Sequence, residues 1–463
     1  MTAPARWLLL PVEVKARGLE GRLLLGAHAA AAGWKVVVGR KNHLNGTLDE
    51  LPRGLYFDKS IQSQAIGQIR YIKALGNTYA AMDEEGLVHE GGATAYVKRR
   101  FSTDTLAATR AFCTWGQAQA DVMRQAEPAL VDRLAVTGNP RVDLWRPELH
   151  DLQRARIKQI RDEVGAFVLF PSNFANVIGA DGPLLTQRFG EVTGHYADPA
   201  ERARFGAYLD LRRGILDRLE VALVALAREL PAGHVLVVRP HPSEDHTFWS
   251  DLAEGEPRLV VRYDGSLTPW MLASDGVVHS NCTTGVEAAV AGVPAIAYAP
   301  LDESDFPMLP NQVSHVVDSD EALVSAVHGV LAGRPVMPES ARTSIEHHLA
   351  ALDGPLAAER MVALFGTLPV RPDRGDGREG RRRTDPLRSL PVRARAWAER
   401  RRNADAPQLP RASATLASQK FPPTPLDEVE EFLDRLRGVD PRLAGVRAAQ
   451  VAPSLFTLEA DDA

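Results

Sequence analysis

Residues 274–298, SDGVVHSNCTTGVEAAVAGVPAIAY, carry the pattern that decides the fold. A short apolar strand ends at His279, a polar turn follows, and an Ala- and Val-rich helix containing Glu287 leads through a Gly-Val-Pro turn into another apolar strand. Repeated strand-turn-helix units of this kind build parallel sheets. The stretch therefore predicts an α/β protein.

The polar turn of this stretch is a candidate phosphate site. Free amides at the helix N-terminus and hydroxyls from Ser280, Thr283 and Thr284 suit phosphate oxygens. Glu287 near the helix start is placed to accept hydrogen bonds from ribose hydroxyls. A buried unit whose threonines only cap the helix is the alternative.

A second strand end carries charged side chains. The stretch HVLVVRPHPSED (234–245) delivers Arg239 and His241 together to the carboxyl end of a buried strand. An Arg can grip diphosphate oxygens as a fork, and a His can donate to the same oxygens or protonate a departing phosphate. The alternative is that this motif forms a rigid turn between strand and helix, with His241 as a capping residue.

The rest of the chain up to residue 365 alternates short apolar runs with amphipathic segments. We expect strands at 7–13, 35–39, 55–58, 78–83, 111–115, 134–138, 167–173, 234–240, 258–263, 276–280 and 294–299. A charged helix at 151–165 separates the first domain, residues 1–150, from a second domain at 166–365. Two α/β halves imply a cleft, and ligands of open sheets bind beyond the carboxyl ends of strands.

Composition excludes several classes of protein. The chain has 463 residues, a formal net charge of −5, and 45% hydrophobic residues, which are values of an ordinary globular protein and argue against a general nucleic-acid binder. Only two cysteines occur, which favours a reducing compartment. The first apolar run is shorter than a signal-peptide core, and no window reaches the roughly 20 apolar residues that span a bilayer. We expect a cytoplasmic protein that binds no nucleic acid.

The C-terminal region differs in character. Residues 366–423 read as an Arg- and Pro-rich flexible linker, and 424–463 as a tail with a short helix that is capped by Thr424. The stretch 371–403 holds twelve arginines against five acidic residues. Such a segment can hold a protein at an anionic membrane surface, so we expect peripheral association with the inner face of the plasma membrane. A solvated linker without a partner is the alternative.

The two strand-end motifs, together with LLLPVEVKARGLEGRLLLGAHAAAAGWKVVVGRK (8–41), DEEG (83–86) and TGNPRVD (137–143), resemble one family. They are similar to the surface carbohydrate biosynthesis proteins, GT-B-type glycosyltransferases of bacterial capsule and lipopolysaccharide assembly. This family is related to Kdo transferases and more distantly to CDP-glycerol glycerophosphotransferases. The resemblance covers roughly residues 6–365.

The resemblance implies a GT-B-like fold of two Rossmann-like doubly wound domains, the first on the acceptor side and the second binding the nucleotide-sugar. It also implies that Arg239 and His241 face the donor phosphates and that Glu287 meets the donor ribose. The turn residues Ser280, Thr283 and Thr284 would hold phosphate. The donor, with CMP-linked sugars among the candidates, is a co-substrate, and no cofactor is expected.

The first half supplies candidates for the acceptor side of the cleft. Glu13, Lys15 and Arg17 follow the first strand, where a solvated loop is the alternative to binding an acidic acceptor or donor carboxylate. In the second half, Asn173 lies at the mouth of a strand and is a candidate donor ligand; an Asn-rich turn is the alternative.

A carboxylate cluster follows another strand of the first half. Asp83, Glu84 or Glu85 is a candidate general base for the acceptor hydroxyl, or a nucleophile for a retaining reaction. An exposed acidic turn is the alternative, and the sequence leaves open which carboxylate acts.

No His, Cys or carboxylate spacing indicates a metal site, so we expect metal-independent chemistry. The resulting hypothesis is a glycosyltransferase that moves a sugar from a nucleotide-activated donor to a surface-polysaccharide or lipid-linked acceptor. Two alternatives stay open. One is a CDP-glycerol-type glycerophosphotransferase or a nucleotide-sugar epimerase, and the other is a non-catalytic nucleotide-sugar-binding scaffold.

Overall fold

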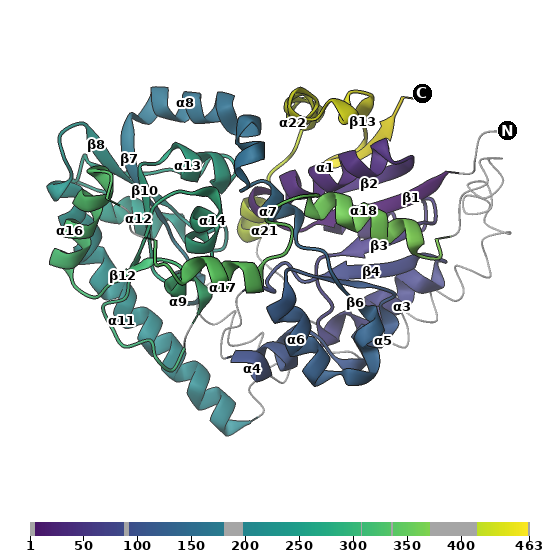
Figure 1. The fold of residues 1–463 in the computed structure, drawn as a ribbon, viewed down its shortest axis with the longest axis horizontal. Helices are drawn as coiled ribbons and strands as arrows, with labels where there is room; N and C mark the ends of the chain where they lie inside the picture. The colour runs from purple at the N-terminus through teal and green to yellow at the C-terminus, as the bar shows by residue number, and fades with distance from the viewer. Residues whose placement is uncertain are drawn as a thin grey trace.

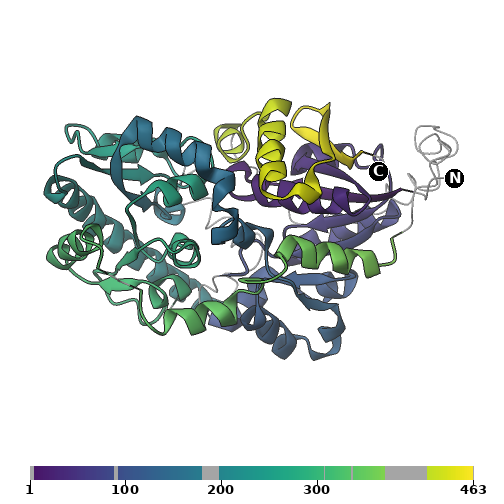
Figure 2. The same cartoon turned by 45° about the horizontal axis from the view of Figure 1, so that its top comes forward.

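The computed structural model describes residues 5–87, 92–179, 198–306, 308–334, 337–370 and 414–461. The described chain forms two α/β halves that lie side by side (Figures 1 and 2). Each half has its own sheet with helices on both faces, as the alternating sequence pattern predicts.

The sheet of the first half has eight strands in the order β13-β14-β2-β1-β3-β4-β5-β6. The six strands that come first in the chain are mutually parallel: β1 (Arg6–Val12), β2 (Trp34–Arg40), β3 (Leu55–Asp58), β4 (Thr78–Met82), β5 (Phe112–Thr114) and β6 (Leu134–Val136). Leu8, Leu9 and Leu10 in β1 are completely buried, which explains why this strand is an unbroken apolar run.

Helices cover both faces of the first sheet. They are α1 (Lys15–Ala31), α2 (Lys41–Gly46), α3 (Ile66–Ala74), α4 (Gly92–Arg100), α5 (Thr103–Ala108), α6 (Gln117–Ala126) and α7 (Pro140–Asp143), with 3-10 turns η1 (Ser63–Ala65), η2 (Pro128–Arg133) and η3 (Pro147–Gln153). Helix α8 (Arg154–Val164) then leads into the second half, where a charged helix was expected.

The sheet of the second half is entirely parallel, in the order β12-β11-β10-β7-β8-β9. Its strands are β7 (Ala166–Pro171), β8 (His234–Arg239), β9 (Leu259–Val261), β10 (Gly276–His279), β11 (Ala295–Tyr298) and β12 (His315–Val317). Five of the six were predicted, and β12 was missed because its three residues include two exposed ones.

The helices of the second half lie on both faces of its sheet (Figure 1). They are α9 (Ala175–Ile178), α11 (Pro199–Glu229), α12 (His246–Leu252), α13 (Leu267–Ala273), α14 (Thr284–Ala291), α15 (Leu309–Gln312), α16 (Asp320–Leu331) and α17 (Ala341–His348). Polar turns at the strand ends β7, β8 and β10 therefore meet along one edge of this sheet, as the sequence motifs indicated.

The chain crosses back to the first half after α17. Helix α18 (Ala357–Thr367) packs against α1, and the buried carboxylate of Asp143 accepts hydrogen bonds from the backbone amides of Ala357 (2.8 Å) and Ala358 (2.9 Å). The last helix of the stretch 166–365 thus belongs spatially to the first half.

The C-terminal region is more structured than a tail with one short helix. It contains α21 (Ala414–Lys420), α22 (Leu426–Val439), the turn η4 (Pro441–Leu443) and two strands, β13 (Val446–Ala452) and β14 (Leu455–Ala460). Strand β14 pairs antiparallel with β2 and brings Phe456 opposite Val38. The predicted terminal helix is confirmed, but Pro425, and not Thr424, is the residue before its first turn. The Arg-rich stretch 371–403 lies outside the described residues.

The close approach of β14 depends on a glycine. Gly39 in β2 has φ +152°, and a Cβ there would lie 2.2 Å from the backbone oxygen of Ser454. A glycine is required because any side chain would collide with the incoming strand.

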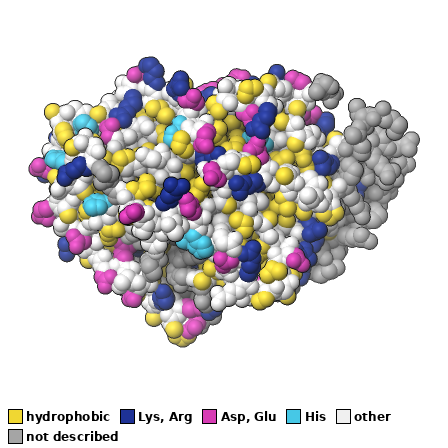
Figure 3. Space-filling view, in the orientation of Figure 1, with side chains coloured by type: hydrophobic (Ala, Val, Ile, Leu, Met, Phe, Trp, Pro, Cys, Tyr) yellow, Lys and Arg dark blue, Asp and Glu magenta, His cyan; other side chains and the backbone are white. Residues whose placement is uncertain are grey.

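On the face shown in Figure 3, basic and acidic side chains are interspersed, in keeping with the small net charge. Among the described residues, no helix is long and apolar enough to cross a membrane.

Candidate active site

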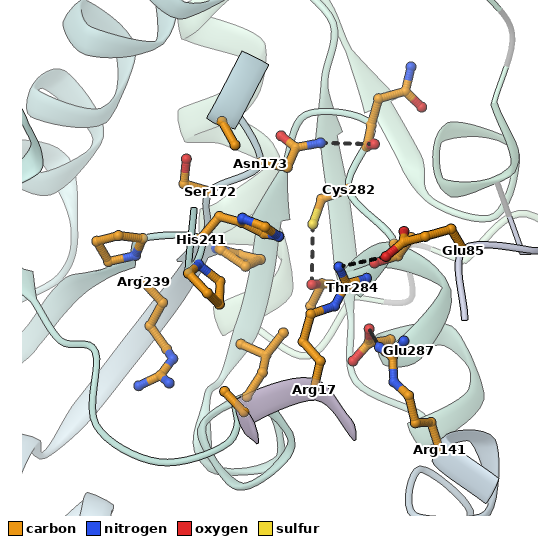
Figure 4. Close-up of a pocket in the computed structure, with 18 of the residues that line it drawn as sticks. Arg17, Glu85, Arg141, Ser172, Asn173, Arg239, His241, Cys282, Thr284 and Glu287 are labelled. Carbon is orange, nitrogen blue, oxygen red and sulfur yellow. Dashed lines mark hydrogen bonds and ion pairs between the residues drawn. The ribbon is translucent and has the colours of Figure 1, made fainter. Parts of the chain in front are cut away.

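A cavity of about 520 Å³ lies between the two halves, at the carboxyl ends of strands from both sheets. Eight of the predicted site residues line it: Arg17, Glu85, Asn173, Arg239, His241, Thr283, Thr284 and Glu287. All of them except Thr283 are labelled in Figure 4. Five others do not: Glu13, Lys15, Asp83, Glu84 and Ser280. The fold thus gathers motifs more than 200 residues apart into one pocket.

His241 is a neutral hydrogen-bond donor on this pocket. Its Nδ1 accepts a hydrogen bond from the backbone N–H of Ser243 (3.1 Å), which assigns the imidazole proton to Nε2. Burial lowers the pKa of His241 to about 3, and the positive charge of Arg17 contributes to the same direction. In Figure 4 the ring points toward Cys282 and Thr284.

Glu244, three residues beyond His241, fixes this strand end and was not singled out from the sequence. Its buried carboxylate accepts hydrogen bonds from Ser172 Oγ (2.8 Å), Trp249 Nε1 (2.9 Å) and the backbone N–H groups of His241 (3.1 Å) and Phe174 (2.5 Å). Burial raises the pKa of Glu244. These four donors join the ends of β7 and β8, so Glu244 positions His241.

Arg239 is used differently from the expectation that it grips the donor phosphates. Its Nη1 and Nη2 donate to the backbone carbonyls of Asp264 (2.9 Å) and Gly265 (3.0 Å), and the guanidinium lies over the ring of Trp270. In Figure 4 it points away from His241. Burial lowers the pKa of Arg239 to about 10. Arg239 therefore stabilises the loop after β9. The RPHP motif by itself does not predict this structural role.

The turn before α14 places only part of its hydroxyls on the pocket. Thr283 and Thr284 line the cavity, and Thr284 Oγ1 lies 3.3 Å from the sulfur of Cys282. Ser280 is completely buried, and its hydroxyl lies 3.4 Å from Nη1 of Arg212, so the expectation that Ser280 holds phosphate is not met.

Asn173 lies on the pocket wall and is held by hydrogen bonds to its neighbours. Its Nδ2 donates to the backbone oxygen of Asn281 (3.1 Å), and its Oδ1 accepts from the buried Arg212 (2.7 Å). Asn173 thus joins the ends of β7 and β10. Its amide therefore supports the wall of the pocket.

The three carboxylates of the DEEG turn lie in different places and have different partners. Asp83 is buried and accepts hydrogen bonds from Tyr96 (3.0 Å) and Arg100 Nε (2.9 Å), and Glu84 pairs with the buried Arg22 (3.3 Å). Only Glu85 reaches the cavity, where its Oε1 lies 3.3 Å from Nη1 of Arg17. Arg17 lowers the pKa of Glu85 to about 2, so Glu85 is ionised.

Two candidates of the first loop lie outside the cavity. Glu13 forms an ion pair with Lys59 (2.6 Å), and Lys15 pairs with Glu428 of α22 (2.7 Å). The expectation that both face the cleft is therefore wrong in this conformation. Their partners come from segments far away in the sequence, which is why the motif alone misplaced them.

Four charged residues that line the pocket were missed as site residues: Glu20, Arg99, Arg100 and Arg141. Two of them contact the opposite half. Arg141, in the TGNPRVD motif, pairs with Glu287 and joins the two halves. Glu20 in α1 lines the pocket and accepts a hydrogen bond from Ser266 of the second half (3.1 Å). Arg141 and Glu20 occur within the stretches that carried the family resemblance, which was the available signal.

Among the described residues, no group of three or more His, Cys, Asp or Glu side chains is arranged to hold a metal ion. The pocket instead carries arginine side chains and the N-terminus of α14.

Three solved structures illustrate what this chain is similar to. The wall teichoic acid polymerase TagF, in a crystal soaked with CDPG, matches with a TM-score of 0.52 and 12% identity over 79% of this chain and 88% of that chain. UDP-GlcNAc 2-epimerase from Neisseria meningitidis bound to UDP-GlcNAc matches with a TM-score of 0.46 and 11% identity over 78% and 98% of the two chains. Anabaena Alr3699/HepE in complex with UDP-glucose gives a TM-score of 0.37 and 12% identity over 83% and 100%.

The likeness to TagF, at this low identity, establishes the GT-B-type fold and nothing finer. No protein-family model matches the sequence. No curated protein matches it either. The predicted fold class is confirmed, and the activity has to be argued from the pocket.

Proposed function

We propose that this chain is a metal-independent GT-B glycosyltransferase that moves a sugar from a nucleotide-activated donor to a surface-polysaccharide or lipid-linked acceptor. One observation carries the proposal. The neutral His241 and the N-terminus of α14 with Glu287 lie on one wall of the cavity, and the Arg17–Glu85 pair lies on the wall contributed by the first half.

The second half supports donor binding. The Nε2–H of His241 is an uncharged donor for a diphosphate oxygen, and Thr283 and Thr284 lie at the helix N-terminus, where anions are stabilised. Glu287, in the first turn of α14, is assigned the ribose hydroxyls. Hydrogen bonds to the diphosphate would strengthen as negative charge develops on the departing nucleotide.

The first half supports the acceptor side. In the transfer step the bond between the sugar C1 and the phosphate oxygen breaks, and a bond from C1 to the acceptor oxygen forms. The acceptor hydroxyl loses its proton to Glu85, an ionised carboxylate on the wall from the first half, and the nucleotide leaves with the bonding electron pair. Arg17 orients Glu85 and keeps it charged.

A glycerophosphotransferase is the second candidate, because TagF shares the fold and was soaked with CDPG. The same pocket could then hold a CDP-linked glycerol phosphate, with attack at phosphorus in place of C1. The remaining alternative functions are a nucleotide-sugar epimerase and a non-catalytic nucleotide-sugar-binding scaffold.

Two measurements separate these functions. The first is a thermal-shift screen of the full chain against CMP-, CDP-, UDP-, GDP- and dTDP-linked donors, since ligands that bind the native state raise its melting temperature. The second is product analysis with the donor found: a new glycosidic bond supports the proposal, whereas a phosphodiester, an isomerised donor, or binding without turnover supports one of the alternatives.

Peripheral membrane binding remains part of this proposal. The stretch 371–403 carries a formal excess of seven positive charges, and lipid-linked acceptors would be found at the cytoplasmic membrane face.

A further inference from the structure

Arg100 is a charged residue of the cavity wall to which the proposed function assigns no role. It is the last residue of α4 and lines the cavity on the side of the first half. Its side chain is 19% exposed, so most of it is buried. Among the described residues that line the cavity, five are arginines and three are glutamates, so the cavity attracts anions although the whole chain has a net charge of −5.

A buried carboxylate fixes the guanidinium of Arg100. Its Nε donates to Asp83 Oδ2 (2.9 Å), and its Nη2 donates to Oδ1 of the same side chain. Asp83 is 1% exposed and also accepts a hydrogen bond from the hydroxyl of Tyr96 (3.0 Å), which is in turn held by Gln119 (2.6 Å). Two parallel hydrogen bonds to one carboxylate set both the position and the plane of a guanidinium. Arg100 is therefore a preorganised cation.

The contacts with Asp83 leave one nitrogen of Arg100 for another ligand. They use Nε and Nη2, and within the described part of the chain the remaining nitrogen, Nη1, has no hydrogen-bond partner. Arg17, by contrast, uses its Nη1 for the ion pair with Glu85. Arg100 thus presents a fixed N–H donor group with a full positive charge, which suits a carboxylate or a phosphate.

Arg100 lies beside the proposed general base. The Oδ1 atom of Asp83 that contacts Arg100 also accepts a hydrogen bond from the backbone N–H of Glu85 (3.2 Å). An anion on Arg100 and a hydroxyl on Glu85 are therefore close enough to belong to one acceptor molecule. Arg17 lowers the pKa of Glu85 most, and Arg100 acts in the same direction. An anion on Arg100 counteracts this effect and makes Glu85 a stronger base when the acceptor is bound.

We propose that Arg100 binds an anionic group of the acceptor, a carboxylate or a phosphate near the hydroxyl that Glu85 deprotonates. The inference rests on the proposed function and deepens it, because it restricts the acceptor to an acidic molecule. Arg100 is then a specificity-determining residue, since a neutral acceptor of the same shape provides no partner for its charge. The negative charge has two possible sources, a sugar acid or a phosphate ester.

The test compares Arg100→Lys and Arg100→Gln with wild type in the full chain. Arg100→Lys keeps a positive charge on Asp83, but its single ammonium cannot replace the guanidinium that serves Asp83 and a second anion together. The matched control is Arg124→Lys, whose pair with Asp121 on α6 does not line the cavity.

Binding is measured by titration calorimetry on each protein, saturated with the nucleotide that the thermal-shift screen identifies. The probes are glucose, glucuronate and glucose 6-phosphate, which share one ring and differ in the group at C6. Glucose is the neutral reference, glucuronate carries a carboxylate, and glucose 6-phosphate carries a phosphate. Nucleotide affinity and melting temperature are measured for every variant.

We expect wild type to bind glucuronate or glucose 6-phosphate about tenfold more tightly than glucose, the lower end for a charge-assisted hydrogen bond. Both Arg100 variants should lose this preference, whereas their affinity for nucleotide and for glucose stays at the wild-type value. Arg124→Lys should match wild type. A preference for glucuronate assigns a carboxylate to the acceptor, and a preference for glucose 6-phosphate assigns a phosphate.

Equal binding of the three sugars by wild type, or an anion preference that survives in a folded Arg100→Lys protein, overturns the inference and leaves the proposed function standing. Loss of nucleotide affinity in Arg100→Lys at an unchanged melting temperature also overturns it, because the cation then serves the donor. Failure of wild type to bind any nucleotide overturns the proposed function itself, and the inference with it.

Discussion

Arg141 of the first half and Glu287 of the second form an ion pair that links the halves at the pocket wall, with Nη2 and Oε1 3.2 Å apart. Both side chains are nearly buried, at 12% and 4% exposure. In Figure 4 they lie together on one side of the cavity. The residue expected to bind the donor ribose is thus also a link between the halves, so we expect donor binding to be coupled to their arrangement.

We predict that Glu287→Gln weakens donor binding by about tenfold, because an uncharged amide is a poorer acceptor for ribose hydroxyls and no longer pairs with Arg141. Turnover at saturating donor should change little. Glu346→Gln, in an exposed pair on α17, is the control. Unchanged donor affinity, measured by calorimetry, would count against the ribose assignment.

Glu85 and Asp83 should respond differently to loss of charge. Glu85→Gln should lower kcat roughly 100-fold or more, as expected for loss of a general base, without loss of donor affinity. Asp83→Asn should chiefly lower the melting temperature, because it leaves Arg100 without its buried partner. Full activity of Glu85→Gln would show that Glu85 is not the general base and that the DEEG turn has only a structural role.

His241→Ala should lower kcat by about 10- to 150-fold through loss of a hydrogen bond to the developing charge. The pKa of His241, about 3, lies below the ordinary value near 6.5, so the imidazole is neutral from pH 8 to pH 5. The rate should therefore show no acid limb near pH 6.5 that depends on His241. A limb present in wild type and absent in His241→Ala would falsify the neutral assignment.

The same pKa depression has a consequence for stability. The unfolded chain binds the proton near pH 6.5 and the native state only near pH 3, so this residue's contribution to stability is present above pH 6.5 and declines as the pH falls toward 3.

Arg239→Ala should lower both the melting temperature and donor affinity, because the carbonyls of Asp264 and Gly265 lose their donors and the loop after β9 loosens. Arg239→Lys should recover only part of the stability, since a single ammonium cannot match the guanidinium fork. Donor affinity that falls while the melting temperature stays at the wild-type value would instead indicate direct phosphate binding.

Membrane association is predicted to depend on the arginines of 371–403. Replacing these twelve residues by Gln in the full chain avoids removing β13 and β14 and should abolish co-sedimentation with anionic liposomes at low salt. Neutral liposomes and high salt are the controls. Equal sedimentation of both proteins, or binding indifferent to lipid charge, would exclude this mechanism.

Local sequence determined most of the secondary structure of residues 6–365 and the edge of the sheet that carries the pocket. Buried parallel strands are continuous apolar runs, so eleven were recognisable, and the turns after β8 and β10 revealed His241 and Thr283–Thr284 by their polar residues. The long apolar sequence of β1, and the alternation of apolar strands with helices along the chain, were sufficient to predict the α/β class. These features arise from contacts between residues close in sequence or from burial common to all parallel strands.

Only the tertiary structure decided which charged side chains face the pocket. Asp83, Glu84 and Glu85 are equivalent in sequence, but Arg100, Arg22 and Arg17 each select one of them. A charge takes the orientation set by its counter-charge, and these partners come from distant segments. Strand β14 was hidden for a similar reason: its place beside β2 depends on the absent side chain of Gly39. Long-range pairing and close approach are properties of the folded chain, and no local pattern encodes them.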